Sequence, residues 1–337
     1  MKDIAFFVRH FTERGTENAI YDYAKYNEEI LGNKSYIICF NETTQRLLGW
    51  PETRISYPKF KARFDVIEIS SFKDMPFIID KYRLDFFYTL THGDHENIYM
   101  FENSEIWTGG ATKNVCKTIK HCVFCTDSMQ GDFYISISNH LNTLYNTNIP
   151  VIPHIVNSPP ECNNLRSYLN IPQDAIVLGR HGGNDTFDIP FVHSSIKQIL
   201  NNGPENLYFL FMNTQAFFEH PRIIYLNATI DINEKNMFIN SCDAMLHARM
   251  QGETFGLSIA EFSVLNKPII TYTNSREKEH IEILGEKAIL YKNEMELMDI
   301  FININYYLKS RNDWNAYRNY SPDKVMELFD NMIFSRR

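Results

Sequence analysis

The chain of 337 residues lacks any apolar run near the ~20 residues that a membrane-spanning helix requires. Its first apolar run, Ile4 to Val8, is too short for the core of a signal peptide and suits a first buried strand. The chain also lacks a repeat of fixed period and any low-complexity tract. These absences predict a globular protein without a membrane span, and they leave peripheral contact with a membrane open.

The chain also has fewer basic than acidic residues. Lysine and arginine number 33 against 41 acidic residues, which gives a net charge of −8. This balance argues against nucleic acid or an anionic membrane as a main partner. Hydrophobic residues make up 44% and charged residues 22% of the chain, as in soluble globular proteins. The length predicts two domains.

Cysteine occurs only six times. Cys122 and Cys125 have the spacing of a metal or redox pair, but the run that holds them resembles a strand, on which residues three apart point to opposite faces. No second pair completes a zinc site. We therefore expect buried free thiols in a reducing compartment, the cytoplasm.

Strand and helix patterns alternate along the chain. In the first half we expect strands at 4–9, 36–40, 65–69, 85–90, 121–125 and 150–152, and helices at 16–31, 75–81 and 128–145. In the second half we expect strands at 175–178, 207–212, 223–226, 242–247, 269–271 and 288–291, and helices at 190–200, 234–241, 257–264, 294–308 and 322–334. This alternation predicts two doubly wound α/β domains at 1–155 and 156–310, followed by a C-terminal helix within 311–337. Ligands of such sheets bind beyond the carboxyl ends of the strands.

The most informative stretch is 241–270, which reads as strand, loop, helix and strand. Two carboxylates, Glu253 and Glu261, stand eight positions apart across the loop and the first turns of the helix. The start of that helix would present the backbone N–H groups of Phe255, Gly256 and Leu257. A helix N-terminus suits a phosphate, and carboxylates accept hydrogen bonds from sugar hydroxyls. The stretch therefore predicts a site for a nucleotide-sugar.

The segment Glu253-Thr-Phe-Gly-Leu-Ser-Ile-Ala-Glu261 resembles the E-x7-E motif of the group 1 retaining glycosyltransferases. These enzymes have the GT-B fold, in which two Rossmann-like doubly wound domains face a cleft. The resemblance implies that Glu253 contacts the donor sugar, that Glu261 binds the ribose and that the backbone of 255–257 meets sugar and phosphate. It also implies that the C-terminal helix crosses back to the first domain.

A second part of the resemblance follows the first strand of the second domain, at Gly179-Arg180-His181-Gly182-Gly183. Glycines at such a place let the backbone approach a phosphate, and Arg180 supplies a cation. Family members have a Gly-Arg here and a lysine about five residues later, and both bases bind the donor diphosphate. This chain has Asp185 in place of that lysine, and Arg249 is our candidate replacement.

In the first domain, His92 follows a predicted strand. Family members often have a histidine here that touches the donor sugar, and imidazole also suits proton handling near neutral pH. His95 is the alternative, and Asp94 could orient either ring. The loop at Gly15 resembles the family's glycine-rich loop near the acceptor, with one glycine retained.

Two further features complete the expectation. Residues 227–231 occupy the place where family members bind the base through backbone atoms, so the base stays unidentified. Glycosyltransferases of the other main fold hold a metal with Asp-x-Asp, which this chain lacks. We therefore expect catalysis without a metal or cofactor, in which arginine and backbone N–H groups stabilise the leaving diphosphate.

These observations and the resemblance together predict a glycosyltransferase of glycan biosynthesis, and the resemblance implies that it retains the anomeric configuration. It would move a sugar from a nucleotide diphosphate-sugar to a hydroxyl of a glycan, lipid or small molecule. Arg180, Glu253 and His92 would carry the chemistry. Two alternatives stay open. One is a nucleotide-sugar epimerase of the UDP-GlcNAc 2-epimerase type, and the other is a non-catalytic nucleotide-sugar-binding protein, which the departure at Asp185 leaves open.

Overall fold

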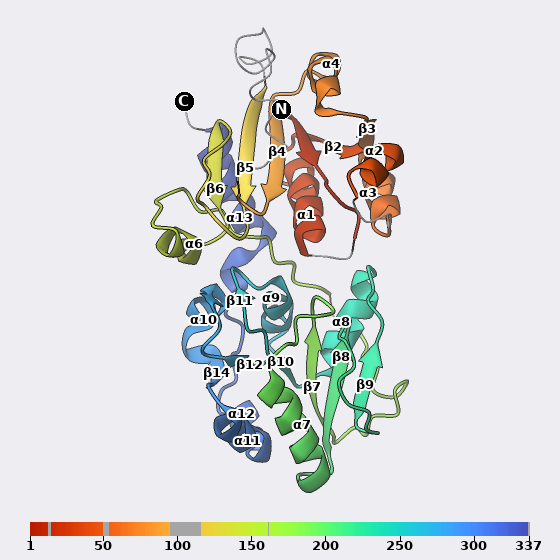
Figure 1. The fold of residues 1–337 in the computed structure, drawn as a ribbon, viewed down its shortest axis with the longest axis vertical. Coiled ribbons are helices and arrows are strands. Elements are labelled where there is room, and N and C mark those ends of the chain that lie inside the picture. Colours follow the sequence, from red (N-terminus) through yellow and green to blue (C-terminus); the bar gives the residue numbers. More distant parts are fainter. Residues whose placement is uncertain (13–14, 50–53, 95–115, 161, 336–337) are drawn as a thin grey trace. The chain divides into compact units, whose positions relative to one another are not determined.

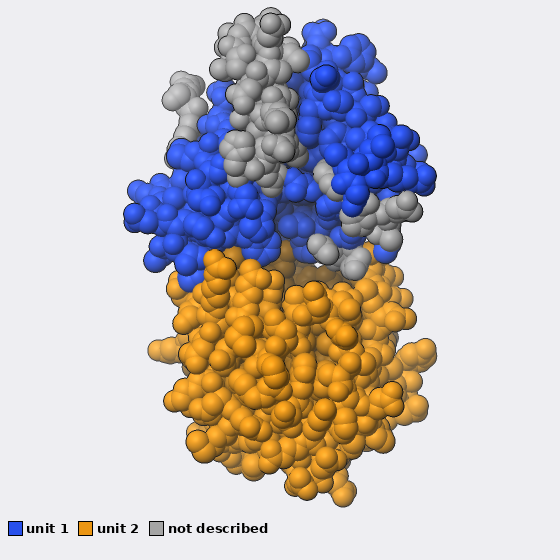
Figure 2. Space-filling model, viewed as in Figure 1, with its two compact units in different colours: residues 1–155, 322–337 blue, residues 156–321 orange. Residues whose placement is uncertain are grey.

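The computed structural model describes residues 1–12, 15–49, 54–94, 116–160 and 162–335. These residues form two compact units (Figures 1 and 2). Unit 1 consists of residues 1–155 and 322–337, and unit 2 consists of residues 156–321. Each unit contains one six-stranded sheet in which all strand pairs are parallel.

The sheet of unit 1 has the strand order β3-β2-β1-β4-β5-β6. Its strands are β1 (Asp3–Phe7), β2 (Lys34–Phe40), β3 (Asp65–Ile69), β4 (Phe86–Thr91), β5 (Lys117–Cys122) and β6 (Phe133–Ser136). Its α-helices are α1 (Gly15–Glu29), α2 (Glu42–Leu47), α3 (Tyr57–Arg63), α4 (Met75–Tyr82), α6 (Asn139–Leu144) and α13 (Pro322–Phe329). The chain builds the sheet outward from β1 to β3 and then returns to β4 beside β1. This reversal makes the β1/β4 carboxyl edge a place for ligands.

The last helix, α13, completes the core of unit 1. Phe329 is fully buried, and its ring lies 5.5 Å from that of Tyr23 on α1 and 6.1 Å from that of Tyr88 on β4. The Tyr23 hydroxyl in turn donates a 2.6 Å hydrogen bond to the carbonyl of Pro153. Residues from both ends of the chain therefore share one hydrophobic core.

The sheet of unit 2 has the order β14-β12-β10-β7-β8-β9. Its strands are β7 (Ile176–His181), β8 (Leu207–Met212), β9 (Ile223–Leu226), β10 (Ala244–His247), β12 (Ile269–Tyr272) and β14 (Ala288–Tyr291). Its α-helices are α7 (Pro190–Asn202), α8 (Ile232–Ser241), α9 (Leu257–Val264), α10 (Glu279–Leu284), α11 (Glu294–Ile302) and α12 (Ile304–Lys309). A separate pair of two-residue strands, β11 (Gly252–Glu253) and β13 (Glu277–Lys278), lies in the loops that follow β10 and β12.

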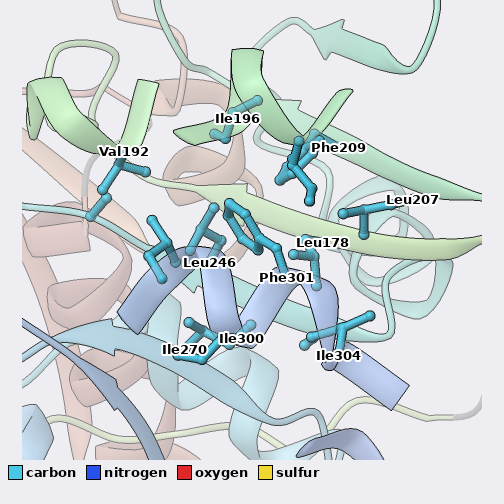
Figure 3. Packing of buried hydrophobic residues seen from close by; sticks show 14 of the residues in the cluster. Leu178, Val192, Ile196, Leu207, Phe209, Leu246, Ile270, Ile300, Phe301 and Ile304 are labelled. Atoms are coloured by element: carbon cyan, nitrogen blue, oxygen red, sulfur yellow. The ribbon is translucent and has the colours of Figure 1, made fainter. Parts of the chain in front are cut away.

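The core of unit 2 packs helices against one face of its sheet (Figure 3). Strand residues such as Leu178, Phe209 and Leu246 meet Ile196 of α7 and Phe301 of α11, and all five side chains are buried. The chain runs from β7 out to β9 and then returns to β10 beside β7. The reversal point of this sheet is therefore the β7/β10 edge.

Most predicted elements are present, but the helix expected at 128–145 is wrong. Strand β6 and the short helix α6 occupy that range. Gly131 turns the chain with φ +87°, and the Asp132 carboxylate accepts a 2.8 Å hydrogen bond from the Thr118 N–H of β5. These contacts align the aromatic and β-branched run from Phe133 as a sixth strand, a long-range pairing that overrides the local pattern.

The strand expected at 121–125 begins earlier, at Lys117, so Cys122 ends β5 and Cys125 lies in the loop beyond it. All six cysteines are free thiols, as expected, and five of them are buried. Within the part of the chain that the structure describes, no helix combines the length and apolar character needed to cross a bilayer.

Replacing Phe329 with alanine tests the contribution of α13 to unit 1. Because this ring is fully buried between two tyrosines, we expect Phe329→Ala to lower the free energy of unfolding by about 3–5 kcal/mol. Phe77→Ala is the matched control, since Phe77 is 69% exposed on α4 of the same unit, and it should cost less than about 0.5 kcal/mol. Urea unfolding followed by circular dichroism measures both. Equal losses would contradict this packing.

Candidate functional site

Two histidines end the two central strands of unit 2. His181 is the last residue of β7, and His247 is the last residue of β10. Met245 pairs with Gly179 in the parallel ladder, so the register brings His247 beside His181. The two rings therefore lie at the carboxyl edge where the sheet reverses, the place where doubly wound folds bind ligands.

Glu253 lies beside the ring of His247. Its Oε1 accepts a 3.1 Å hydrogen bond from Nη1 of Arg249 and lies 3.4 Å from Nε2 of His247. Burial alone would raise the pKa of Glu253, but the His247 hydrogen bond and the Arg249 charge lower that pKa to about 2. Glu253 is therefore a carboxylate at neutral pH, and 19% of its side chain stays exposed to a ligand.

The backbone around Glu253 leaves little freedom in its placement. Gly252 has φ +74°, and a Cβ at this position would lie 2.0 Å from the carbonyl oxygen of Glu277. Only glycine permits this close approach of β11 to β13. The short β11–β13 pairing thus fixes where the Glu253 side chain begins.

A buried polar chain stands behind His247. Its Nδ1 lies 2.9 Å from Oγ1 of Thr271, its direct neighbour on β12, and that oxygen lies 3.1 Å from Nε2 of His280 on α10. All three side chains are buried. With His247 as a neutral imidazole, one assignment satisfies the chain: His280 donates to Thr271, Thr271 donates to His247, and His247 donates to Glu253. This chain orients the imidazole that holds Glu253.

Glu261 has a matching set of partners beside the ring of His181. Its Oε2 lies 2.9 Å from Nε2 of His181, and its Oε1 accepts a short hydrogen bond from the Lys235 ammonium of α8. Burial would raise the pKa of Glu261, but the Lys235 charge and then the His181 hydrogen bond lower that pKa to about 2. Sequence reasoning missed Lys235, since its helix carries no motif and its distance from Glu261 along the chain is 26 residues.

The start of α9 lies between the two acids in sequence. Gly256 is its N-cap residue with φ +84°, and no described side chain caps the helix. Phe255 is buried and its carbonyl accepts a 2.7 Å hydrogen bond from the Tyr317 hydroxyl, while Leu257 opens the helix. No side-chain cap therefore competes with an anion at the start of this helix.

Arg180 is hydrogen-bonded to both loops that follow β7 and β8. It is 3% exposed, its Nη1 donates to Asn213 O (3.2 Å) and Thr214 Oγ1 (2.5 Å), and its Nη2 donates to Gly183 O (2.8 Å) and Thr186 Oγ1 (2.5 Å). Gly182 lies against the same group, since a Cβ there would be 2.9 Å from Nη2. In this structure Arg180 positions Gly182 and Gly183, and its contact with a phosphate stays a prediction.

Electrostatics place Arg180 in the same cluster as the first acid. Burial lowers the pKa of Arg180 to about 10, Glu253 opposes this shift, and the neighbouring Arg249 adds to it. Arg249 contacts Glu253 and also donates a 3.2 Å hydrogen bond from Nη2 to Oε1 of Gln251. Three residues that the sequence singled out, Arg180, Arg249 and Glu253, therefore interact.

Two other predicted positions lie elsewhere in unit 2. Asp185 is exposed in the loop after β7. Residues 227–231 precede α8, and Asp231 caps that helix by accepting a hydrogen bond from the Asn233 N–H.

The remaining predicted residues lie in unit 1. Nδ1 of His92 is 2.8 Å from Oδ2 of Asp94 in the loop after β4, and the ring stacks on Phe124. Asp94 therefore orients His92, which the sequence left open. Gly15 begins α1. The alternative residue His95 lies outside the described residues.

With this geometry established, comparison with known proteins identifies the fold. No protein-family model and no curated protein sequence matches the chain. Solved structures do match: a glycosyltransferase from Rickettsia africae has a TM-score of 0.69 at 16% identity, with 99% of each chain covered. HepE of Anabaena in complex with UDP-glucose has a TM-score of 0.69 at 13% identity, over 98% of this chain and 99% of that one.

The chain has the GT-B fold. A putative UDP-N-acetylglucosamine 2-epimerase from Listeria monocytogenes also matches, with a TM-score of 0.58 at 10% identity over 100% of this chain and 97% of that one. At these identities the neighbours establish only the fold. Any inference about activity has to come from the site residues described above.

Replacing Lys235 with methionine tests the charge state of Glu261. Because the ammonium is the main group that lowers the pKa of Glu261, we expect Lys235→Met to raise this pKa well above 2. A carboxylate whose pKa is lowered in the folded state stabilises the fold at pH values above its unfolded pKa of about 4.3. That stabilisation disappears as the pH falls toward 2. In Lys235→Met the pKa is no longer lowered as far, so the variant should lack this part of the stability at neutral pH. Carboxyl 13C titration by NMR measures the shift. Lys309→Met, an exposed change on α12, should leave the titration of Glu261 unaltered; an unaltered curve in Lys235→Met would refute the pairing.

Proposed function

We propose that unit 2 binds a nucleotide diphosphate-sugar and that the protein transfers the sugar to a hydroxyl acceptor with retention of configuration. One observation carries the proposal: two carboxylates with lowered pKa values stand at the carboxyl edge of neighbouring central strands, and the uncapped start of α9 lies between them in sequence. Hydroxyl groups require acceptors and a diphosphate requires donors. This edge offers both.

Each acid retains acceptor capacity for a ligand. His247 and Arg249 both contact Oε1 of Glu253, so Oε2 can accept from hydroxyls of the donor sugar. Glu261 receives one partner on each oxygen, and a carboxylate can accept about four hydrogen bonds, so the ribose diol can still bind. Side-chain exposures of 19% and 25% keep both acids accessible.

The leaving diphosphate would be stabilised by positive charge at the same edge. Arg249 and the N–H groups of residues 255–257 would contact the phosphates, and buried Arg180 would hold Gly182 and Gly183 so that their backbone can approach. The bond between the sugar carbon and the diphosphate oxygen breaks as the acceptor oxygen forms its bond on the same face. The acceptor proton passes to the leaving oxygen, which accounts for retention without a covalent intermediate. His92 would contact the sugar, and no metal acts on the diphosphate.

Epimerisation is the second candidate function, since a putative UDP-sugar epimerase shares the fold. The two reactions differ in their products. A transferase releases the nucleoside diphosphate in proportion to the glycosylated acceptor, whereas an epimerase converts the nucleotide-sugar without any acceptor. Nuclear magnetic resonance of the products distinguishes them directly.

UDP-glucose is the first donor to test, because the HepE neighbour is a complex with it. We expect UDP-glucose at 100 times its Kd to stabilise the protein by about 2.7 kcal/mol, seen as a raised Tm. Glu253→Gln should weaken binding of UDP-glucose by about 10- to 100-fold, the value of a hydrogen bond to a charged group, and should change UDP binding little. Glu286→Gln, which changes an acid outside the site, is the control. Failure of UDP-, GDP- and ADP-sugars alike to bind would refute the proposal.

Arg249 should contribute to affinity through the diphosphate. We expect Arg249→Ala to weaken UDP binding by about 10-fold or more and UMP binding much less, because only UDP carries the second phosphate. Arg276→Ala, 64% exposed on the same unit, should change neither affinity. Calorimetric titration measures all four constants. Normal UDP affinity in Arg249→Ala would exclude it as the replacement for the missing lysine.

A further inference from the structure

Three potential metal ligands, His92, Asp94 and Cys125, converge in unit 1 where the loops after β4 and β5 meet, and Asp127 lies next to one of them. Nδ1 of His92 lies 2.8 Å from Oδ2 of Asp94 and 3.8 Å from Sγ of Cys125. The same sulfur lies 2.9 Å from Oδ1 of Asp94 and 3.5 Å from Oδ1 of Asp127. One imidazole, one thiol and one carboxylate thus offer ligand atoms that all lie within 4.8 Å of one another, and the Asp127 carboxylate reaches the thiol from the loop beyond.

The spacing of these atoms fits a tetrahedral zinc site. Zinc bonds of about 2.0 Å to nitrogen or oxygen and about 2.3 Å to sulfur place neighbouring ligand atoms about 3.3–3.6 Å apart. The distances from 2.8 to 3.8 Å bracket these values. Small side-chain rotations would therefore convert the contacts among His92, Asp94 and Cys125 into three coordination bonds, and a larger rotation of the exposed Asp127 side chain would supply the fourth.

The backbone holds the two loops together independently of the side chains. The N–H groups of Phe124 and Cys125 both donate to the carbonyl of His92, at 2.9 and 3.0 Å. Gly93 has φ +115°, and a Cβ there would lie 1.9 Å from the carbonyl oxygen of Cys125, so only glycine permits this approach. The His92 ring also stacks on Phe124, with ring centroids 5.1 Å apart. The ligands are therefore preorganised.

A buried lysine balances the charge of the cluster. Lys120 on β5 is fully buried, and its ammonium donates to the Asp94 carbonyl (2.8 Å), the Ser128 carbonyl (2.9 Å) and Oε1 of Gln130 (2.7 Å). A divalent cation bound by a thiolate and two carboxylates carries one negative charge in total. The ammonium next to it brings the sum to zero, which lowers the cost of burial.

We propose that His92, Asp94, Cys125 and Asp127 bind one Zn²⁺ ion. Imidazole and thiolate favour zinc over magnesium or calcium, which prefer oxygen alone. The ion would tie the loop after β4 to the loop after β5 and would occupy Nδ1 of His92, so that only Nε2 could face a substrate. The site is independent of the proposed donor binding in unit 2, and it departs from the metal-free expectation for the chain.

Cobalt titration of the untagged full-length protein tests this site. After treatment with a chelator, the wild type should bind one equivalent of Co²⁺ at the site and show the near-ultraviolet charge-transfer band of a cobalt–thiolate bond. Zinc should displace the cobalt and abolish the band. Cys125→Ser should lose the band, whereas Cys162→Ser, a partly exposed thiol of unit 2, should keep it.

A second variant keeps the test valid if Cys125→Ser does not fold. Asp127 is exposed, so Asp127→Asn should fold normally, retain the band and bind Co²⁺ at least tenfold more weakly. Absence of stoichiometric binding in the wild type, a band that survives in Cys125→Ser, or unchanged affinity in Asp127→Asn would overturn the proposal. None of these results depends on a nucleotide-sugar, so they are separate from a failure of the proposed function.

Discussion

The arrangement of unit 2 depends on keeping two carboxylates ionised where the sheet largely buries them. Withdrawing a charge from water costs several kcal/mol unless partners compensate. Each acid therefore receives a histidine from the end of a central strand and a cation from a different element, Arg249 for Glu253 and Lys235 for Glu261. The parallel register that aligns β7 with β10 brings the two histidines side by side. Sheet topology thus determines the electrostatics of the site.

The two acids also differ in the contacts that hold their side chains in place. Glu253 lies at the end of a polar chain through His247, Thr271 and His280 that is buried throughout, so its position is fixed by the core. Glu261 is held by Lys235, which reaches it from α8, and by His181 at the end of β7. The first acid is thus tied to the core through a relay of three side chains, whereas the second is tied directly to a helix and a strand.

Sequence reasoning located the acids because their helix is bounded by local cues. Gly256 and Pro268 delimit α9, and its predicted range, 257–264, agrees with the structure. The partners were beyond its reach, because Lys235 and His280 come from other elements and no spacing rule links them to the acids. The wrong helix at 128–145 has the same cause: the pairing of β6 with β5 depends on Thr118 and Asp132, which are 14 residues apart.

The structure changes the predicted role of Arg180. An exposed guanidinium would simply contact a phosphate, but Arg180 is buried. As a buried group, Arg180 still acts through its charge: burial and the neighbouring Arg249 oppose its protonated form, whereas Glu253, Asp188 and Asp185 favour it. The start of α9 adds a partial positive charge to the same edge. With a pKa of about 10, the guanidinium stays protonated at neutral pH, so a cation remains at this edge although Asp185 stands where the resemblance implies a lysine.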